Sequence, residues 1–444
     1  MKVVIAGAAR SGLAAAKLAK SESYDVFLTE LKNEDKSSEV KKTLIEHDIP
    51  HEFGGHSYSK LSGADYLVVS PGIPPTAEII KEAENQKIKI ISEIEFAWMH
   101  CNNPIIAITG TNGKTTTTAL TAYIINNSGR KAVATGNIGL PMSSVVKGLK
   151  KDEIVVAELS SYQLDRIIDF RPDVAVILNI TPDHLSYHGS MESYINAKFK
   201  ISANQNEKNL LILNHDDEIS SRGEIKSNVE LAYFSMSSAV RGIYNDRGRM
   251  MINFRQHKVA EEIMLFNELA LPGVHNAYNS MAAALAARAL EVRNENIRDS
   301  LRTFKGVEHR LEFVRSISGI DFINDSKATN INATWFALSS YDRPVIWLAG
   351  GRGDNNDYSQ LDKVVGENVK AIVSIGEESE NIFNYFCTKK RCVQEQTLES
   401  AVKAAYELAD LGDIVLFTPA CKSFDMFMNF EQRGEYFKEI VNSL

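Results

Sequence analysis

A short apolar run that leads into a glycine loop and then a long helical stretch constrains this chain more than any other feature. Residues 105–108 are apolar, as in a buried strand, and the loop from Gly110 to Gly113 precedes Lys114, Thr115 and a helix-forming segment. Strand, glycine loop and helix in this order predict a nucleotide-binding unit, because loop N–H groups and the helix N-terminus both attract phosphate. We expect Lys114 to neutralise the β- and γ-phosphates and Thr115 to ligate Mg²⁺.

The spacing of this loop differs from that of the common phosphate loop. That pattern places a glycine where this chain has Ile108, so the glycines here are more closely spaced. The alternative interpretation is a helix start with a solvated lysine, but the preceding strand and the following helix favour a nucleotide. The other loop residues predicted to face the phosphates are Thr111, Asn112 and Thr116.

The composition is that of an ordinary globular protein. The chain has 444 residues, of which 44% are hydrophobic and 24% charged, and its length suggests about three domains of ~150 residues. A net charge of −8 excludes a general basic field for nucleic acid or anionic membranes. Apolar runs are too short for a signal peptide or a membrane span, and the four cysteines lack metal-type spacing. We therefore expect a cytoplasmic monomer.

Strands alternate with helices along the chain, which predicts an α/β fold throughout. Residues 2–30 have a strand–helix–strand pattern, and the continuous apolar runs 153–159 and 173–180 suit a parallel sheet covered on both faces. Residues 229–266 alternate apolar and polar side chains and predict a small antiparallel excursion. The predicted domains are residues 1–95, 96–306 and 307–444.

The first strand is followed by Gly7-x-Ala9-x-x-Gly12, and the second strand ends at Glu30. This nearly matches the dinucleotide-binding fingerprint, but the Cβ of Ala9 would hinder close approach of a pyrophosphate. A nicotinamide-dependent oxidoreductase is therefore disfavoured. Another nucleotide or phosphate at this turn, or a tight turn without a ligand, stays open.

Three polar residues lie near predicted strand ends or helices of the central block. Glu158 ends a strand, and a carboxylate at that edge near a phosphate loop is where a further Mg²⁺ ligand would lie. His184 follows the next strand, and Lys198 lies in a predicted helix. A loop histidine and a helix lysine are usually ordinary surface groups, so neither indicates a site without the others.

Seven segments occur together in an order that resembles the Mur ligases of bacterial peptidoglycan synthesis: TGTNGKTTT, ELSSYQL, NITPDHL, LPGVHN, EHRLE, NDSKATN and PACKSFDMFMNFEQRG. The last segment resembles the D-glutamate-adding branch of that family. The resemblance covers the whole chain and implies three domains. These are an N-terminal Rossmann-like domain for a UDP-sugar, a central P-loop-type mononucleotide-binding α/β domain for ATP, and a C-terminal Rossmann-like domain for the amino acid.

The activity implied by the resemblance is ATP-dependent amide-bond formation between UDP-N-acetylmuramoyl-L-alanine and D-glutamate. A carboxylate is a poor electrophile and needs a phosphate leaving group, and transfer between two anions calls for bridging cations, so two Mg²⁺ ions are expected. A folylpolyglutamate synthase-like ligase is the near alternative, but such enzymes lack a separate UDP-binding domain. A nucleotide-dependent regulatory protein would lack the synthetic step.

The resemblance also implies roles for individual residues. Catalytic positions are Lys114, His184, Lys198 and Lys327. Metal-site positions are Thr115, Glu158, His184 and Lys198, the last matching a lysine that the family carbamylates. Further ATP contacts are Asn276, Asn279, Arg310 and Asp325. Contacts to the UDP substrate are Arg10, Ser11, Thr29, Ser70, Pro71, Gly72, Asn137 and His184. Contacts to D-glutamate are Thr329, Ser423, Phe424 and Phe430.

The chain departs from the family pattern at three places. Ser186 stands where the family usually has an aspartate, and Ala9 with Arg10 alters the first glycine turn, where Arg10 could contact a diphosphate. Asp354 stands where many members have a lysine for a carboxylate of D-glutamate. We expect Arg352 to replace that lysine.

Overall fold

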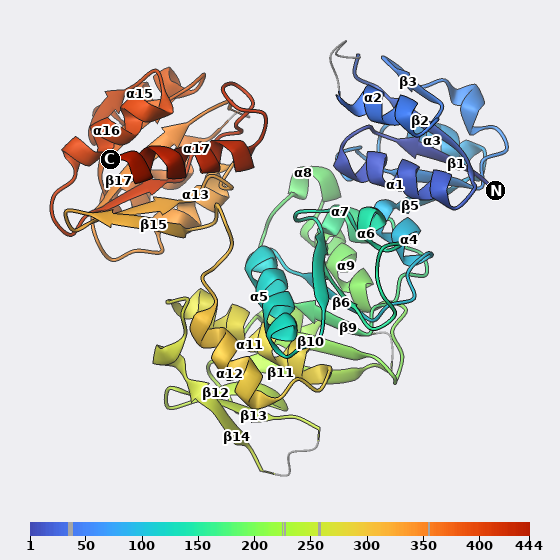
Figure 1. Ribbon diagram of the computed structural model, residues 1–444, viewed down its shortest axis with the longest axis horizontal. Coiled ribbons are helices and arrows are strands. Elements are labelled where there is room, and N and C mark those ends of the chain that lie inside the picture. Colours follow the sequence, from blue (N-terminus) through green and yellow to red (C-terminus); the bar gives the residue numbers. More distant parts are fainter. Residues whose placement is uncertain (34–38, 224, 226–227, 256–258, 354–355) are drawn as a thin grey trace. The chain divides into compact units, whose positions relative to one another are not determined.

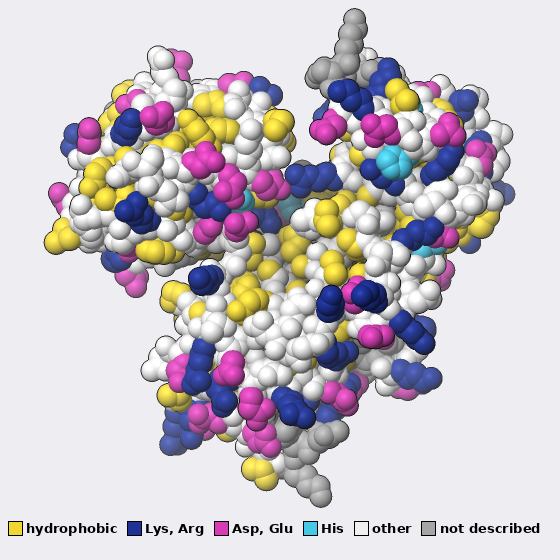
Figure 2. Space-filling view, viewed as in Figure 1, with side chains coloured by type: hydrophobic (Ala, Val, Ile, Leu, Met, Phe, Trp, Pro, Cys, Tyr) yellow, Lys and Arg dark blue, Asp and Glu magenta, His cyan; other side chains and the backbone are white. Residues whose placement is uncertain are grey.

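The computed structural model describes residues 1–33, 39–223, 225, 228–255, 259–353 and 356–444, which form two compact units, Met1–Phe304 and Lys305–Leu444 (Figure 1). Acidic and basic side chains are interspersed over the visible face of each unit (Figure 2), as the absence of a basic field in the sequence predicts. Within the described ranges, no helix combines the length and the apolar character needed to cross a membrane.

The first unit begins with a parallel sheet of strand order β3-β2-β1-β4-β5. Its central strand β1 is buried because alternate residues face opposite helical layers: Val3 and Ile5 share a core with α1, and Val4 and Ala6 share one with α3. The strands are β1 (Lys2–Ala6), β2 (Asp25–Glu30), β3 (His51–Phe53), β4 (Tyr66–Val69) and β5 (Lys89–Ser92), and the helices are α1 (Arg10–Ser21), α2 (Glu39–Glu46) and α3 (Glu78–Asn85).

The same unit contains a larger sheet of order β14-β13-β12-β11-β10-β9-β6-β8-β7, in which β6 lies between two parallel neighbours. The predicted antiparallel excursion is confined to β12–β14, because β11 pairs in parallel with both β10 and β12. Alternating side chains suit either strand direction, so the sequence could not distinguish them. The strands are β6 (Ile105–Thr109), β7 (Ala132–Gly136), β8 (Ile154–Glu158), β9 (Val174–Ile177), β10 (Leu210–Asn214), β11 (Glu230–Ser235), β12 (Gly242–Asp246), β13 (Arg249–Asn253) and β14 (Glu261–Leu265).

Helices cover this sheet, and the two longest, α5 and α11, pack against each other (Figure 1). The helices of this part are α5 (Lys114–Asn127), α6 (Met142–Val145), α7 (Ser161–Asp165), α8 (Leu185–His188), α9 (Met191–Phe199), α10 (Glu218–Arg222), α11 (Val274–Ala289) and α12 (Asn294–Thr303).

A buried helix, α4 (Glu93–Trp98), joins the two sheets of the first unit. The Glu95 carboxylate accepts hydrogen bonds from the backbone N–H groups of Ile168, Asp169 and Phe170 at 2.9–3.0 Å. Glu93 accepts one from Ser143 N at 2.6 Å. Charged acceptors of backbone donors are among the stronger hydrogen bonds, so Glu95 fixes α4 to the segment before β9, and Glu93 adds a bond to α6.

The second unit is a sheet of order β15-β16-β20-β17-β18-β19, parallel except for the β15–β16 pair. Strand β17 alternates between two cores: Trp347 faces the one formed with α13, α14 and α15, and Leu348 the one formed with α16 and α17. The strands are β15 (Glu312–Ile317), β16 (Ile320–Asn324), β17 (Val345–Gly350), β18 (Val369–Ile375), β19 (Arg391–Gln394) and β20 (Ile414–Phe417). The helices are α13 (Ile331–Leu338), α14 (Asp362–Asn368), α15 (Ser379–Phe386), α16 (Leu398–Leu408) and α17 (Phe430–Ser443).

Burial of Glu93 predicts a pH-dependent stability. Burial raises the pKa of Glu93 to about 7, and its Oε2 has no hydrogen-bond partner among the described residues. A carboxyl whose pKa is raised on folding stabilises the protein when protonated, and this stabilisation is lost as pH rises from about 4.5 to about 7. Glu93→Gln, which stays neutral, should have a melting temperature near that of the wild type at pH 5 and a higher one at pH 8.

Differential scanning calorimetry at the two pH values tests this expectation. Glu84→Gln, on an exposed position of α3, is the matched control. The same difference between Glu93→Gln and the wild type at both pH values would contradict it.

Candidate functional site

At two positions of the glycine loop, the backbone conformation and the surrounding atoms require glycine. Gly110 has φ +154° and Gly113 has φ +82°. A Cβ on Gly110 would lie 2.9 Å from the Cβ of Leu178, and one on Gly113 would collide with Oδ1 of Asn279. The loop therefore closes tightly between the end of β6 and the start of α5, and the N-terminal N–H groups of α5 follow at once.

Two lysines converge on one carbonyl of this loop. Lys114 Nζ donates to Gly110 O at 2.9 Å and to Thr111 O at 2.7 Å, and Lys198 Nζ donates to Gly110 O at 2.8 Å. Lys198 is 1% exposed and lies over the Tyr194 ring. Burial, and then the charge of Lys114, hold the pKa of Lys198 well below its usual range. The sequence-based alternative of a solvated helix lysine is thus wrong.

Neighbouring strands and helices hold the loop in place. Thr111 N donates to Asn179 O at 2.9 Å, Asn112 N donates to Asn179 Oδ1 at 2.8 Å, and the Thr111 hydroxyl lies 3.0 Å from the Tyr194 hydroxyl. Asn279 on α11 accepts from the Thr117 hydroxyl at 3.3 Å, and its amide donates to Asn276 Oδ1 at 3.3 Å. Asn279 therefore lies against the loop, and Asn276 contacts Asn279.

Glu158 ends β8 directly beside the loop, since it pairs with Ile108 across the sheet. It is 2% exposed; its Oε1 accepts from Asn137 Nδ2 at 2.8 Å, and its Oε2 is buried without a hydrogen-bond partner among the described residues. An unpaired buried carboxylate oxygen is costly unless something binds it. With the buried Thr115 hydroxyl at the start of α5, this donor set of hard oxygens fits Mg²⁺.

His184 lies at the start of α8 in a left-handed conformation, φ +52°. Its Nε2 lies 3.3 Å from Asp183 Oδ2 and its ring centroid 4.9 Å from that of Tyr162. Burial lowers the pKa of His184, and the charges of Lys114 and Lys198 lower it further. The charge of Asp183 acts in the opposite direction and raises this pKa. A neutral imidazole beside the two lysines is suited to metal ligation. The side chain of Ser186 lies outside the described part.

The predicted UDP-contact residues of the N-terminal sheet lie at the carboxyl ends of β1, β2 and β4. Glu30 accepts from Ala8 N at 2.8 Å and Lys32 N at 2.9 Å, so its carboxylate braces the glycine turn. The buried Thr29 hydroxyl donates to Glu52 Oε1 at 2.8 Å. Besides Thr29, the predicted UDP contacts at this edge are Arg10, Ser11, Ser70, Pro71 and Gly72.

A second group of predicted residues lies in the second unit. Asp325 follows β16 and accepts from the Thr418 hydroxyl at 2.9 Å and from Leu311 N at 3.2 Å; burial raises its pKa to about 7. Lys327 lies over the Phe430 ring at 5.8 Å. The remaining members are Arg310, Thr329, the buried Ser423 and the exposed Phe424.

The sequence-based residue list missed Arg433, although it belongs to the quoted NFEQRG segment. Its guanidinium is fully buried and donates to Ser326 Oγ at 3.0 Å, Ser326 O at 2.8 Å and Cys421 O at 3.1 Å. Burial lowers the pKa of Arg433 to about 10. Arg433 therefore ties the loop after β16 to the loop after β20, the two loops that carry most of this group. A lone arginine in a polar segment gives no signal of burial.

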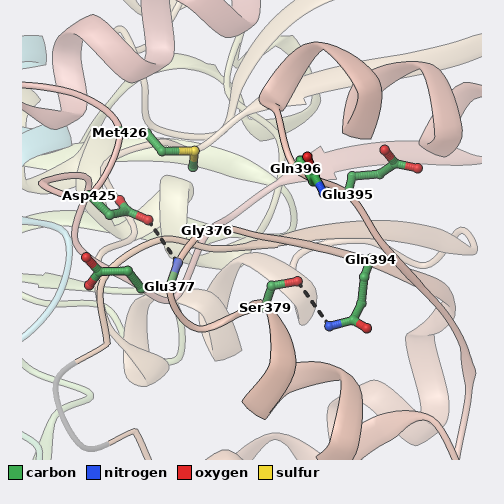
Figure 3. A pocket seen from close by; sticks show the side chains of 8 residues that line it. All are labelled: Gly376, Glu377, Ser379, Gln394, Glu395, Gln396, Asp425 and Met426. Carbon is green, nitrogen blue, oxygen red and sulfur yellow. Dashed lines mark hydrogen bonds between the residues drawn. The ribbon is translucent and has the colours of Figure 1, made fainter.

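Arg352, the predicted D-glutamate contact, forms a two-pronged ion pair with Glu377 at 2.8 and 2.7 Å. Glu377 lines a cavity of about 560 Å³ with Asp425, whose Oδ2 accepts from Glu377 N at 3.2 Å (Figure 3). A guanidinium that binds one carboxylate through two parallel hydrogen bonds can bind the carboxylate of a ligand in the same way. Asp354 lies outside the described residues.

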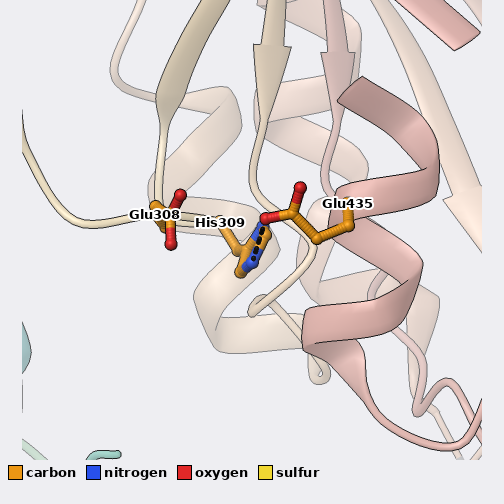
Figure 4. Close-up of side chains that lie close together, drawn as sticks. All are labelled: Glu308, His309 and Glu435. Carbon is orange, nitrogen blue, oxygen red and sulfur yellow. Dashed lines mark ion pairs between the residues drawn. The ribbon is translucent and has the colours of Figure 1, made fainter. Parts of the chain in front are cut away.

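A cluster of Glu308, His309 and Glu435 in the second unit has the composition of a cation site (Figure 4). The Lys438 ammonium, however, lies 3.1 Å from Glu308 Oε1 and 2.8 Å from Glu435 Oε1. This lysine already neutralises the carboxylates, so the cluster needs no metal.

Family comparisons match all three parts of the chain. Residues 1–92 match the Mur ligase MurD-like N-terminal domain, 108–287 the Mur ligase middle domain, and 309–421 the Mur ligase glutamate ligase domain. Relatives named UDP-N-acetylmuramoylalanine–D-glutamate ligase include a Salinibacter ruber protein, 42% identical over 100% of this chain and 98% of its own length. The one from Clostridioides difficile is 40% identical over the same shares.

Solved structures share the fold at low identity. MurF from Acinetobacter baumannii aligns with TM-score 0.61 and 19% identity over 99% of this chain and 94% of its own. UDP-N-acetylmuramate-alanine ligase MurC from Thermotoga maritima aligns with TM-score 0.60 and 20% identity over 100% and 99%. MurF from Thermotoga maritima, solved with ADP, aligns with TM-score 0.56 and 16% identity over 94% and 95%.

The loop geometry predicts a specific defect in nucleotide binding. Gly113→Ala should weaken Mg²⁺–ADP binding at least tenfold, because the new Cβ would push Asn279 away and open the loop. Gly129→Ala is the matched control: Gly129, two residues after α5, has a similar φ of +86° but nothing within 4 Å of a new Cβ. Both variants bear the backbone strain, ~1–2 kcal/mol, and only Gly113→Ala has the collision. Isothermal titration that finds equal affinities in the two variants would contradict this account.

Proposed function

The chain belongs to the Mur ligase family, and on that basis we propose that it joins D-glutamate to UDP-N-acetylmuramoyl-L-alanine, an ATP-dependent amide-bond formation in peptidoglycan precursor synthesis. The observation that carries this proposal is the convergence of Lys114 and Lys198 on the glycine loop beside Glu158 Oε2, which has no hydrogen-bond partner among the described residues. That arrangement brings lysine side chains and a buried carboxylate oxygen to the place where a nucleotide triphosphate and its cation would bind.

The reaction has two steps. A carboxylate oxygen of UDP-N-acetylmuramoyl-L-alanine attacks the γ-phosphorus of ATP, the bond to the bridging oxygen breaks, and ADP leaves. The amine nitrogen of D-glutamate then attacks the acyl carbon, the carbon–oxygen bond breaks with its electron pair leaving on phosphate, and the amine loses a proton. The loop N–H groups and Lys114 hold the phosphates, so the protein contributes mainly position and charge.

Two Mg²⁺ ions complete the proposed site, with Thr115 and Glu158 serving the first and His184 the second. Mg²⁺ bound there would neutralise the negative charge of the two anionic reactants, the substrate carboxylate and the ATP phosphates. The residues fit, since Glu158 offers a buried oxygen with no hydrogen-bond partner among the described residues.

We also propose that Lys198 is carbamylated. Its burial and the nearby charge of Lys114 favour the neutral amine, which can add to CO₂ with loss of a proton. The product is an anion that would offset the charge of Lys114 and serve the metal site.

We also propose that Asn276 and Asn279 of the first unit, and Arg310 and Asp325 of the second, are further ATP contacts. We assign the amino acid to Thr329, Arg352, Ser423, Phe424 and Phe430, and a catalytic role to Lys327. The domain boundaries stay as proposed from the sequence, 1–95, 96–306 and 307–444, and the protein is proposed to act as a cytoplasmic monomer.

Phosphate release tests the overall proposal. Purified protein with Mg²⁺–ATP and UDP-N-acetylmuramoyl-L-alanine should release phosphate with D-glutamate and not with L-glutamate, L-lysine or diaminopimelate. Omission of either the sugar nucleotide or the amine should abolish release. Release with a different donor, or with none, would overturn the assignment.

The Arg352 assignment makes a separate prediction. Arg352→Ala should raise the KM for D-glutamate at least tenfold and leave the KM for ATP within about twofold, because a two-pronged carboxylate contact is worth ~1.5–3 kcal/mol. Arg343→Ala, which removes a similarly exposed arginine paired with Asp321 at 2.7 Å, is the control. An unchanged KM for D-glutamate in steady-state kinetics of Arg352→Ala would remove Arg352 from the site.

A further inference from the structure

The side chains of Asn137 and Glu158 form a direct link between two proposed binding functions. Asn137 N donates to Glu158 O at 2.9 Å, and Asn137 Nδ2 donates to Glu158 Oε1 at 2.8 Å. Asn137 is exposed, whereas Glu158 is buried. One residue is a proposed contact of the sugar nucleotide and the other a proposed ligand of Mg²⁺.

The loop that carries Asn137 is held tightly against β8. Gly136 has φ +99°, and a Cβ there would collide with the carbonyl oxygen of Glu158. Gly136 N donates to Leu140 O at 3.0 Å, and the Thr135 hydroxyl donates to the same oxygen at 2.6 Å. The backbones of Asn137 and Glu158 are therefore fixed next to each other. A change in the conformation of one side chain must alter the position of the other.

The bond fixes the orientation of the Asn137 amide. Glu158 Oε1 accepts from Asn137 Nδ2, so the amide has its Oδ1 turned away from Glu158. Asn137 then offers a ligand only an acceptor, which suits a hydroxyl or an amide N–H of the sugar nucleotide. In the other direction, the bond occupies Oε1 of Glu158 and leaves Oε2 as the oxygen for a cation.

From this geometry we infer that Asn137 is a positioning residue that couples sugar-nucleotide binding to metal binding through Glu158. A ligand held by Oδ1 keeps the amide in the orientation that holds Glu158, and a cation on Oε2 keeps Glu158 in the orientation that holds Asn137. Each ligand therefore favours the arrangement that the other needs. This inference rests on the proposed function, since it takes the two ligands from it.

Coupling of this kind is reciprocal and measurable. If the sugar nucleotide tightens metal binding by some factor, the metal must tighten sugar-nucleotide binding by the same factor, typically ~5–150-fold. We expect UDP-N-acetylmuramoyl-L-alanine at saturation to lower the Mn²⁺ dissociation constant of the full-length protein, with a non-hydrolysable ATP analogue present, at least fivefold. Electron paramagnetic resonance of free Mn²⁺ measures this without turnover, and calorimetry of the sugar nucleotide with and without Mn²⁺ supplies the reciprocal factor.

The variants isolate the Asn137–Glu158 bond. Asn137→Ala and Asn137→Asp should both bind each ligand more weakly, and the coupling factor should fall to between one- and twofold in both. Asn126→Ala is the matched control, because Asn126 makes hydrogen bonds of 3.0 and 3.1 Å with Ala132 at the opposite end of β7. Its coupling factor should equal that of the wild type.

The outcomes separate this inference from the proposed function. Wild-type coupling that survives in Asn137→Ala, or a wild type without coupling although both ligands bind, would overturn the inference while the ligase assignment stands. No binding of the sugar nucleotide to the wild type would instead refute the proposed function, and the inference with it. Unchanged Mn²⁺ affinity in Glu158→Gln would show that Glu158 does not bind the metal, and the inferred coupling would then be overturned.

Discussion

The carbonyl oxygen of Gly110 accepts hydrogen bonds from the Nζ atoms of two lysines, and the rest of the site is arranged around this pair of contacts. Lys114 and Lys198 approach it to 2.9 and 2.8 Å from different helices. Two cations so close repel each other, and one of them is almost fully buried, so the arrangement is stable only if a lysine loses its charge or an anion joins them. A polyphosphate resolves the conflict by adding negative charge, and modification of Lys198 would resolve it by changing the sign of one partner.

The carboxyl edges of the two larger sheets place the functional groups. In the first unit β6, β8 and β9 end side by side, which brings together the glycine loop, Glu158 and the segment leading to His184. In the second unit β16 and β20 are neighbours, and Asp325 contacts Thr418 just past their ends. Parallel strands have their carboxyl ends at one edge of the sheet. The pairing of the strands therefore brings together residues that follow different strands and are far apart in the sequence.

Features encoded by neighbouring residues could be predicted from the sequence. The glycine loop, the apolar strands such as β8 and the α/β class follow from short-range patterns, and the motif order identified the family. Contacts between distant residues could not be predicted. The hydrogen bond from Asn137 to Glu158, the burial of Arg433 and the paired state of Arg352 each depend on a partner that the sequence does not indicate. The edge strand β19 was also missed, because its short, partly exposed sequence has no apolar run. The domain boundaries and the individual site roles stay predictions.

The buried Arg433 has a consequence for the order in which the protein can mature during synthesis. It holds Ser326, which precedes it by 107 residues, and the carbonyl of Cys421. Strands β16, β17, β18 and β20 all precede α17 in the chain, so Arg433 is made after every one of them. The loops after β16 and β20 are therefore joined through this guanidinium only once the last helix has been synthesised and has docked. A chain truncated before Arg433 would retain every residue of the first unit and would lack this link in its second.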